Sequence, residues 1–433
     1  MTLVVLVALA CVGISESVAN RQTSKDRVDI TYWEKWTGPE ATVMRQLVNR
    51  YNASQNKVHV NYVTISTIDV KTLLSTSGGD PPDVAGIWVE NLVQFEDANM
   101  LTDLTDMAAK AGLDKNYYVK NYWDMMNYNG RLYAFPSTPA STALHVRPDL
   151  IPAQYASPDT FPKTLDEFDD LMFAVTKKDE DGKLKQAGFM PTNPGWWHWS
   201  WPYLFGGSLY DGKEITIDTP DNLRAFEWCK KYADHLGPDA MTEFQSAFGN
   251  NSSPEDPFMV GKVVTEFNGV WKGHYIKEQK PDTPWFAVPL PYRNDRPDLA
   301  NHSMITSDIL VIPTGAKHLK EAFDFLRFTQ SQPEMEALCK GQGKNSPLAK
   351  VSDAFYKDHT NKFIHLFDQL ARSPTAFYSP QIGVFPQLRS EMDDVFQEIT
   401  TGQKSPKKAL DDAQDHMSEL WHTYRVQVLG EPQ

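Results

Sequence analysis

This 433-residue sequence is poor in cysteine and lacks the sequence motifs of cofactor and metal sites. It contains three cysteines, Cys11, Cys229 and Cys339, which are too few for a disulfide framework. Cys229 and Cys339 lie in helical patterns, so we expect both to be buried free thiols. The Cys/His spacing of a metal site, a glycine-rich phosphate-binding loop and an internal repeat are all missing from the sequence. We therefore predict no cofactor and no bound metal.

Basic residues are also in the minority. The sequence has 42 lysines and arginines against 56 aspartates and glutamates, which gives a formal net charge of -14. A nucleic-acid-binding protein needs a basic face, and here the basic residues form no run. We therefore expect no nucleic-acid partner and a soluble, acidic surface.

Long apolar runs are limited to residues 3–10, near the start of the sequence. This run is too short to cross a membrane, which takes about 20 apolar residues, but it suits a secretory signal. Ser17-Val18-Ala19 offers small residues for cleavage, so residues 1–19 are predicted to be a signal peptide or a lipoprotein signal. In the lipoprotein alternative Cys11 carries the lipid. Both alternatives predict a protein of the periplasm or the extracytoplasmic membrane face, either free or lipid-anchored.

The length and the patterning indicate two α/β lobes. A single core stops growing near about 250–300 residues, so this chain favours two lobes. A strand pattern over residues 28–32, a helical pattern over 38–51 and a second strand pattern over 58–63 form a strand–helix–strand unit. Such units build mainly parallel sheets.

Three breaks in the alternating pattern suggest that the chain crosses repeatedly between the lobes. We predict an N-terminal lobe of residues 28–138 plus 306–345. The C-terminal lobe is then formed by residues 139–305 plus 346–433. This is the organisation of a hinged clamp with a ligand cleft between two lobes.

Tryptophan is concentrated in one segment. Trp196, Trp197, Trp199 and Trp201 lie within six residues, in a chain that has 12 tryptophans. An indole offers a flat apolar face and an N–H donor, and a pyranose ring needs both a stacking face and partners for its hydroxyls. Alternation along the run predicts that one set of rings packs in the core and the other faces the cleft. Trp199 and Trp201, with the neighbouring His198, are taken as ligand contacts.

Other candidate contacts stand near the predicted ends of strands. In open α/β sheets, ligands bind beyond the carboxyl ends of the strands. The candidate aromatic residues are Trp36, Trp88 and Trp271, and the candidate partners of hydroxyl groups are Glu34, Glu90, Asn91, Asn268 and Asp308.

An ordered set of motifs resembles the family 1 extracellular solute-binding proteins, which include maltose-binding protein. Gly78-Gly79-Asp80-Pro81-Pro82-Asp83-Val84 matches the family's most recognisable motif, and residues 30–40 resemble its opening strand and glycine loop. Residues 162–168 and 258–271 are similar to later signatures, with Leu165 and Val270 departing from them.

This resemblance implies a periplasmic-binding-protein fold of type II, in which two α/β lobes joined by several crossovers close on a ligand. It also implies that Trp271 stacks on a sugar and that the closed protein delivers the sugar to the permease subunits of an ABC importer.

Two other functions compete with this prediction. A quaternary amine such as betaine or choline binds in an aromatic cage by cation–π attraction, which the tryptophan count would also suit. A secreted carbohydrate-active enzyme needs two carboxylates about 5–9.5 Å apart, but no nucleophile elbow, metal triad or cofactor loop supports this alternative. We therefore predict a receptor, not an enzyme, that acts as a monomer and binds a neutral mono- or oligosaccharide.

Overall fold

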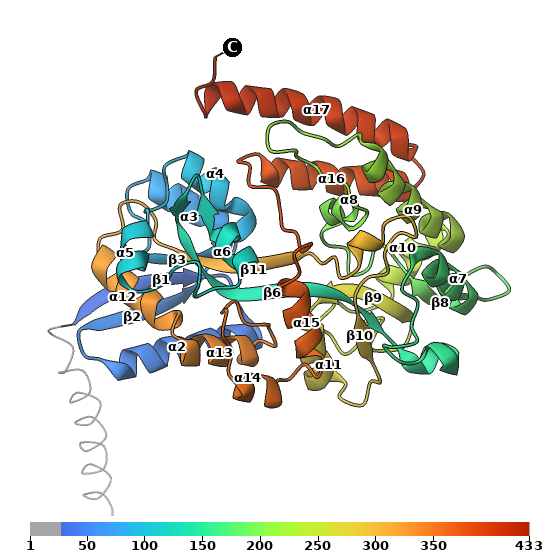
Figure 1. Cartoon of the computed structure of the whole chain (residues 1–433), viewed down its shortest axis with the longest axis horizontal. Coiled ribbons are helices and arrows are strands. Elements are labelled where there is room, and N and C mark those ends of the chain that lie inside the picture. The colour runs from blue at the N-terminus through green and yellow to red at the C-terminus, as the bar shows by residue number, and fades with distance from the viewer. Residues whose placement is uncertain (1–26, 433) are drawn as a thin grey trace, which may run out of the picture.

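The structure is a computed structural model, and it describes residues 27–432. The predicted signal at residues 1–19, with its cleavage site and Cys11, lies outside the described residues. Helices and strands alternate along the described part, as expected (Figure 1). No helix within that part is both long and apolar enough to span a membrane.

The first part of the sheet is parallel. Strand β1 (Val28–Glu34) lies between β2 (Val58–Thr64) and β3 (Val84–Trp88) and pairs in parallel with both. Helices α2 (Gly38–Ser54) and α3 (Ile68–Ser77) make the connections, so the predicted strand–helix–strand unit is present. Helix α2 has a proline in its first turn, and it buries a face that includes Met44 and Leu47.

The longest strand, β6 (Ala134–Val146), links the two parts of the sheet. Residues 134–141 pair antiparallel with β11 (Ile305–Val311), which also pairs with β3. Residues 142–146 pair instead with β9 (Val263–Gly269). All of β6 is buried. The strand therefore connects the two parts of the sheet, and its partner changes from β11 to β9 after Ser141.

The second part of the sheet extends from β6 through β9 and β8 (Leu184–Phe189) to β7 (Lys177–Lys178), while β10 (Phe286–Val288) pairs with β6. The remaining elements are β4 (Asn127–Tyr128), β5 (Arg131–Leu132), α4 (Leu92–Asp97), α5 (Thr105–Lys110), α6 (Lys120–Met126), α7 (Leu165–Val175), α8 (Trp201–Leu204), α9 (Pro220–Leu236), α10 (Pro238–Ser246), α11 (Lys272–Gln279), α12 (Leu319–Thr329), α13 (Gln332–Gly341), α14 (Asp353–Lys357), α15 (Ile364–Ala371), α16 (Phe385–Thr400) and α17 (Pro406–Gln427), with 3-10 turns η1 (Val89–Asn91), η2 (Pro148–Leu150), η3 (Ala153–Tyr155), η4 (His198–Ser200) and η5 (Pro297–Leu299).

Two large apolar cores flank the crossover. The first packs Ile30 with Phe325, and the second packs Phe168 with Met392. Leu348 and Phe367 belong to the first core, so the core does not change at the predicted lobe boundary 345/346. The exact division into lobes stays a prediction.

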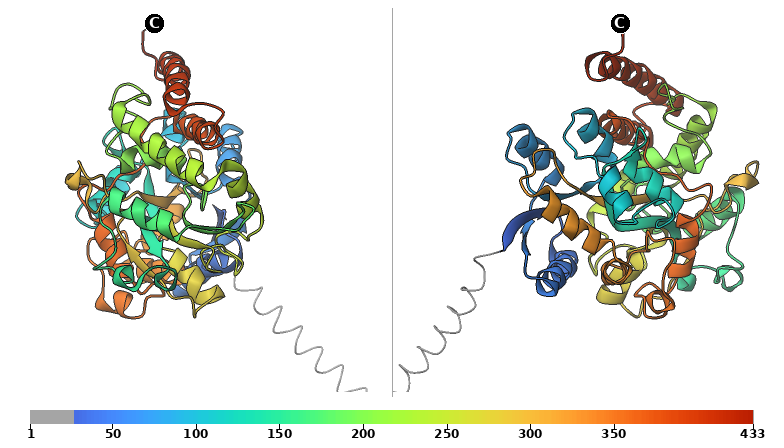
Figure 2. Two further views of the ribbon diagram at one scale, coloured as in Figure 1. Left: turned by 90° about the vertical axis from the view of Figure 1, so that its right-hand side faces the viewer. Right: turned by 60° about the vertical axis from the view of Figure 1, so that its left-hand side comes forward.

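The two C-terminal helices, α16 and α17, lie together at one end of the molecule (Figures 1 and 2). Near the end of α17 the Tyr424 hydroxyl donates a hydrogen bond of 2.8 Å to Oδ2 of Asp97, the last residue of α4. The C-terminal helix thus ties the end of the chain to the N-terminal lobe.

The two cysteines in the described part are buried and free, as predicted. Cys229 lies in α9 and Cys339 in α13. Burial raises the thiol pKa of Cys229, which keeps the group neutral and unreactive.

Candidate functional site

Two tryptophans meet at the carboxyl ends of neighbouring parallel strands. Trp36 follows β1 and Trp88 ends β3, and their rings form an edge-to-face pair with centroids 6.2 Å apart. The side chain of Trp88 is 40% exposed. Because β1 and β3 are adjacent and parallel, residues far apart in the sequence reach the same edge of the sheet.

Lys35 lies beneath this pair. Its ammonium is 4.3 Å from the centre of the Trp88 ring, 3.3 Å from Glu34 Oε1 and 3.1 Å from Asp308 Oδ1. Glu34 is fully buried, accepts a 2.6 Å hydrogen bond from the Tyr32 hydroxyl, and has its pKa raised by burial. Glu34 and Asp308 therefore hold Lys35 under the tryptophans, and their role as ligand contacts stays a prediction.

Trp271 stands between β9 and α11 and packs against the first core. Its indole packs against Gly269, where an added Cβ would lie 2.4 Å from the ring, so only glycine leaves room for it. The Lys344 ammonium lies 3.9 Å from the centre of the Trp271 ring and 5.8 Å from that of Trp36. The ammonium therefore contacts aromatic rings from two distant parts of the sequence.

Lys344 contacts aromatic rings but forms no ion pair within the described residues. Within residues 27–432 no carboxylate oxygen lies within 4.0 Å of its ammonium. Burial lowers the pKa of Lys344 to about 8, because a charged ammonium loses hydration there. No sequence motif singles out this residue, which follows a glycine-rich break.

In the tryptophan run, the rings that reach Trp271 are Trp196 and Trp197. Their centroids lie 6.3 and 5.6 Å from that of Trp271, and Trp196 is 44% exposed. Trp199 and Trp201 are only 1% and 4% exposed and belong to the second core. These two rings lie in the core of the structure, and their role as ligand contacts stays a prediction.

The local backbone explains the difference. Trp197 has a positive φ of 58° and is followed directly by η4 and α8. The run is thus a turn into helix rather than a strand, and strand-like alternation does not apply to it.

His198 contacts α16 instead of the tryptophan cluster. Its Nδ1 lies 2.8 Å from Asp393 Oδ1, and its ring stacks on Phe396 with centroids 3.9 Å apart. It lines a different hollow, of about 440 Å³, near α10 and α16.

Glu90 and Asn91 face a hollow of about 260 Å³ between η1 and the start of α16, across from Arg389. Glu90 Oε1 accepts a 3.1 Å hydrogen bond from Thr306 Oγ1, and burial raises the pKa of Glu90. These two predicted residues therefore lie where η1 of the N-terminal lobe meets α16, in a hollow separate from the Trp271 ring.

Asn268 belongs to a buried network behind Trp271. The Lys272 ammonium lies 2.8 Å from Asp256 Oδ1 and 2.9 Å from Glu266 Oε2, and it donates a 2.9 Å hydrogen bond to Asn251 Oδ1. Asn268 Nδ2 donates to Asn251 Oδ1 and to Glu266 Oε1, both at 2.7 Å. Asn268 is fully buried, so we assign it to the support of the Trp271 segment.

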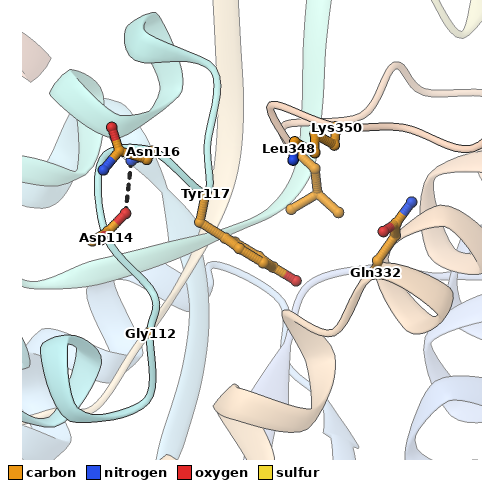
Figure 3. Close-up of a pocket in the computed structure, with 7 residues that line it drawn as sticks. All are labelled: Gly112, Asp114, Asn116, Tyr117, Gln332, Leu348 and Lys350. Carbon is orange, nitrogen blue, oxygen red and sulfur yellow. Dashed lines mark hydrogen bonds between the residues drawn. The ribbon is translucent and has the colours of Figure 1, made fainter.

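A further pocket of about 350 Å³ lies away from the tryptophans (Figure 3). The Tyr117 side chain projects into it from one side, and Gln332 and Leu348 lie on the other. Its wall contains no tryptophan and only a single aromatic ring, so we do not assign it to the ligand. Within the described residues no cluster of side chains suits a metal ion.

Comparisons with known proteins agree with this architecture. Residues 46–363 match the model of a family described as bacterial extracellular solute-binding protein. The chain is 20% identical to the sn-glycerol-3-phosphate-binding periplasmic protein of Pectobacterium atrosepticum, over 95% of each chain.

Solved structures give the same picture. The mannobiose-bound form of a protein designated CpMnBP1 is similar with a TM-score of 0.78 at 23% identity, covering 90% of this chain and 99% of that one. The ABC substrate-binding protein Lmo0181 of Listeria monocytogenes, in complex with cycloalternan, gives a TM-score of 0.73 at 16% identity, covering 91% and 99%. The predicted type II periplasmic-binding-protein fold is thereby confirmed.

Proposed function

Because the chain belongs to the family of bacterial extracellular solute-binding proteins, we propose that it is an extracytoplasmic receptor that captures a neutral carbohydrate between its lobes and delivers it to the permease of an ABC importer. The observation that carries this proposal is a set of five tryptophans in two groups, Trp36 with Trp88 and Trp271 with Trp196 and Trp197, which Lys344 links through its contacts with Trp36 and Trp271. Flat apolar faces with N–H edges suit a pyranose ring, which is apolar on its faces and polar at its rim.

The ligands bound in these two structures, mannobiose and cycloalternan, are also carbohydrates. The curated relative is named for sn-glycerol-3-phosphate, a small polyol phosphate. That name suggests an anionic ligand as an alternative to a neutral carbohydrate, and the ammonium of Lys344 is the group that would attract such a ligand. Glycerol 3-phosphate therefore belongs in any ligand screen.

A quaternary amine fits the site less well. Lys344 already places a cation between Trp36 and Trp271, so a second cation there would meet like charge. An enzymatic role has no support either, because the relatives are binding proteins and the acidic residues under the tryptophans are held by Lys35.

In the mechanism, the lobes move about the crossover at β6. A sugar that contacts tryptophans of both lobes stabilises the closed form by its differential affinity for it. A sugar ring that stacks on the face of Trp271 now covered by the Lys344 ammonium displaces that ammonium, since both require the same ring face. Closure then shields the hydroxyl contacts from water.

A thermal-shift screen tests the proposal. The purified protein is heated with mono-, di- and trisaccharides, polyols, glycerol 3-phosphate, betaine and choline. A ligand at a thousandfold its dissociation constant adds about 4 kcal/mol of stability, which corresponds to several degrees of melting temperature. We expect a shift with one class of sugar.

The matched variants are Trp271→Ala and Trp421→Ala, because Trp421 lies in α17, far from the cluster in sequence and packed against Tyr210. The sugar-dependent shift should vanish only in Trp271→Ala. A shift with glycerol 3-phosphate or with betaine alone would replace the carbohydrate by that ligand, and no shift with any sugar would refute the ligand class.

A further inference from the structure

We propose that His198 is a positioning residue, which ties the turn carrying Trp196 and Trp197 to α16 and thereby sets the affinity of the receptor for sugar. This inference rests on the proposed function, in which these two rings stand beside Trp271. His198 begins η4, directly after the two rings in the sequence. Its own side chain contacts α16, so its effect on binding passes through the turn.

The backbone of this turn needs support from its surroundings. Gly195 has a φ of 86° and Trp197 a φ of 58°, so two of three consecutive residues lie in the left-handed region. That region is uncommon for a bulky side chain such as the one at Trp197. Residues in such conformations persist only where neighbouring contacts over-determine them. The turn therefore depends on the contacts that fix its two ends.

Few side chains hold the turn in place. At its start, Gln245 Nε2 donates a 2.7 Å hydrogen bond to the carbonyl oxygen of Thr192, but Gln245 is exposed. Within the part of the chain that the structure describes, the side chains of residues 193–197 form no hydrogen bond. His198 is the next residue along the chain whose side chain bonds to another element. It is therefore the anchor at the end of the turn.

His198 contacts two residues that lie about one turn apart on α16. Its Nδ1 lies 2.8 Å from Asp393 Oδ1, and its ring stacks on Phe396 with centroids 3.9 Å apart and planes inclined by only 6°. Its Nε2 is buried and has no partner within residues 27–432, so the proton belongs on Nδ1, from which it is donated to the carboxylate. Phe396 is 2% exposed and belongs to the second core. The imidazole is thus fixed in both position and orientation.

A second histidine–carboxylate pair on α16 gives a matched comparison. His416 Nδ1 of α17 lies 2.8 Å from Glu391 Oε2, the same distance as in the pair of His198 with Asp393. Glu391 precedes Asp393 by two residues, so the two carboxylates leave the helix on different faces. The pair of His416 therefore repeats the chemistry without a link to the tryptophan turn.

Circular dichroism tests the position of the rings without any ligand. Trp196 and Trp197 lie 6.3 and 5.6 Å from Trp271 by their centroids, and neighbouring indoles couple with a signal that depends on their mutual geometry. The difference spectrum between a protein and its Trp271→Phe variant isolates this signal. It should be smaller in the background of His198→Phe, which keeps a ring on Phe396 but loses the hydrogen bond. It should be unchanged in the background of His416→Phe.

Isothermal titration calorimetry measures the consequence for binding, with the sugar that gives the thermal shift. His198→Phe should bind at least about fivefold more weakly, which lies within the effect of losing a hydrogen bond to a charged group. His198→Asn should recover most of the affinity, because the amide nitrogen of asparagine can donate to Asp393 from the place of Nδ1. His416→Phe should bind as the unmodified protein does.

A double-mutant cycle checks that the two residues act through one contact. Asp393→Ala should weaken binding as much as His198→Phe does, and the double variant should lose no more than either single variant. Additive losses would overturn the positioning role, because His198 and Asp393 would then act separately.

An unchanged difference spectrum together with unchanged affinity in His198→Phe would overturn the positioning role and leave the proposed function intact. Equal losses of affinity in His198→Phe and His198→Asn, with an unchanged difference spectrum, would also overturn it, since His198 would then contact the sugar itself. Failure of every sugar to bind the unmodified protein would instead overturn the proposed function. The difference spectra, which need no ligand, would still decide whether His198 positions the rings.

Discussion

The ammonium of Lys344 lies 3.9 Å from the centre of the Trp271 ring. Lys344 comes from the segment after α13 and Trp271 from the start of α11, so the contact joins two distant parts of the chain. A cation–π contact of this kind is worth about 0.5–2 kcal/mol. In the absence of ligand, the lysine therefore covers the ring face on which we place the sugar.

Replacing this lysine should strengthen sugar binding. Lys344→Met keeps much of the side-chain length but removes the charge that competes for the ring. The gain should lie between about twofold and thirtyfold, which follows from the worth of the cation–π contact. Titration calorimetry measures it directly, with Lys350→Met as the control because Lys350 is exposed and lies outside the tryptophan cluster. Weaker binding in Lys344→Met would mean that Lys344 contacts the ligand itself.

The same contact predicts a pH dependence. Burial lowers the pKa of Lys344 to about 8, with Asp308 and Glu40 opposing the shift and Lys35 adding to it. As the pH rises from 7 to 9 the ammonium loses its proton and its hold on the ring, so sugar affinity should increase. In Lys344→Met this increase should be absent. A pH profile that is the same in both proteins would contradict the role of Lys344.

Substitutions of a buried and of an exposed tryptophan within residues 196–201 should affect different properties. The first should lower folding stability, and the second should weaken sugar binding. Trp199→Ala empties a buried site and should lower the free energy of unfolding by about 3–5 kcal/mol. Trp196→Ala changes a half-exposed ring and should alter stability by less than about 0.5 kcal/mol, while it weakens sugar binding. Urea denaturation and titration calorimetry of both variants measure the two quantities. If Trp199→Ala is stable but binds sugar more weakly, we would infer that Trp199 contacts the ligand.

The sequence predicted the architecture better than the individual contacts. The strand–helix–strand unit at β1, α2 and β2 follows from period-2 and helical spacing, which local patterns encode well. The placement of Trp36 and Trp88 at adjacent strand ends follows from the parallel sheet. These features depend on local periodicity and on topology, and both can be read from the order of residues.

The contacts that the sequence did not predict depend on tertiary packing. Trp199 and Trp201 are core residues because a left-handed residue at Trp197 turns the chain into a helix, and strand spacing does not encode that turn. Glu34 and Asn268 look like cleft residues by position, but each is fully buried in a hydrogen-bonded network. Lys344 could not be found at all, because only the fold brings it to Trp271.

The buried network behind Trp271 should be costly to break. Lys272→Met leaves Asp256 and Glu266 without their cation, and such a loss costs about 3–5 kcal/mol. Burial raises the pKa of Glu266 to about 7. The protonated Glu266 carboxyl therefore contributes to stability at low pH, below the pKa that Glu266 has in the unfolded chain. This contribution is lost as the pH rises through about 7.

Lys272→Met should accordingly lower the free energy of unfolding more at pH 8 than at pH 5. At pH 5 Glu266 is protonated and no longer needs a cation. Urea denaturation at both pH values measures this difference. Lys277→Met, an exposed change on the same helix, should have little effect at either pH. An equal penalty for Lys272→Met at both values would show that the ionisation of Glu266 is not involved.

The link between α17 and α4 should stabilise the end of the chain locally. Tyr424→Phe removes the 2.8 Å hydrogen bond to Asp97, a half-buried carboxylate whose pKa is raised by burial. A hydrogen bond to a charged group contributes about 1.5–3 kcal/mol, so the last turns of α17 should open more often. Hydrogen exchange should become faster in residues 420–427 and stay unchanged in α9. Tyr155→Phe is the control, because within the described residues the Tyr155 hydroxyl makes no hydrogen bond to another side chain. Unchanged exchange in Tyr424→Phe would mean that the other contacts of α17, such as the buried Met417 and Trp421, hold the helix in place without this hydrogen bond.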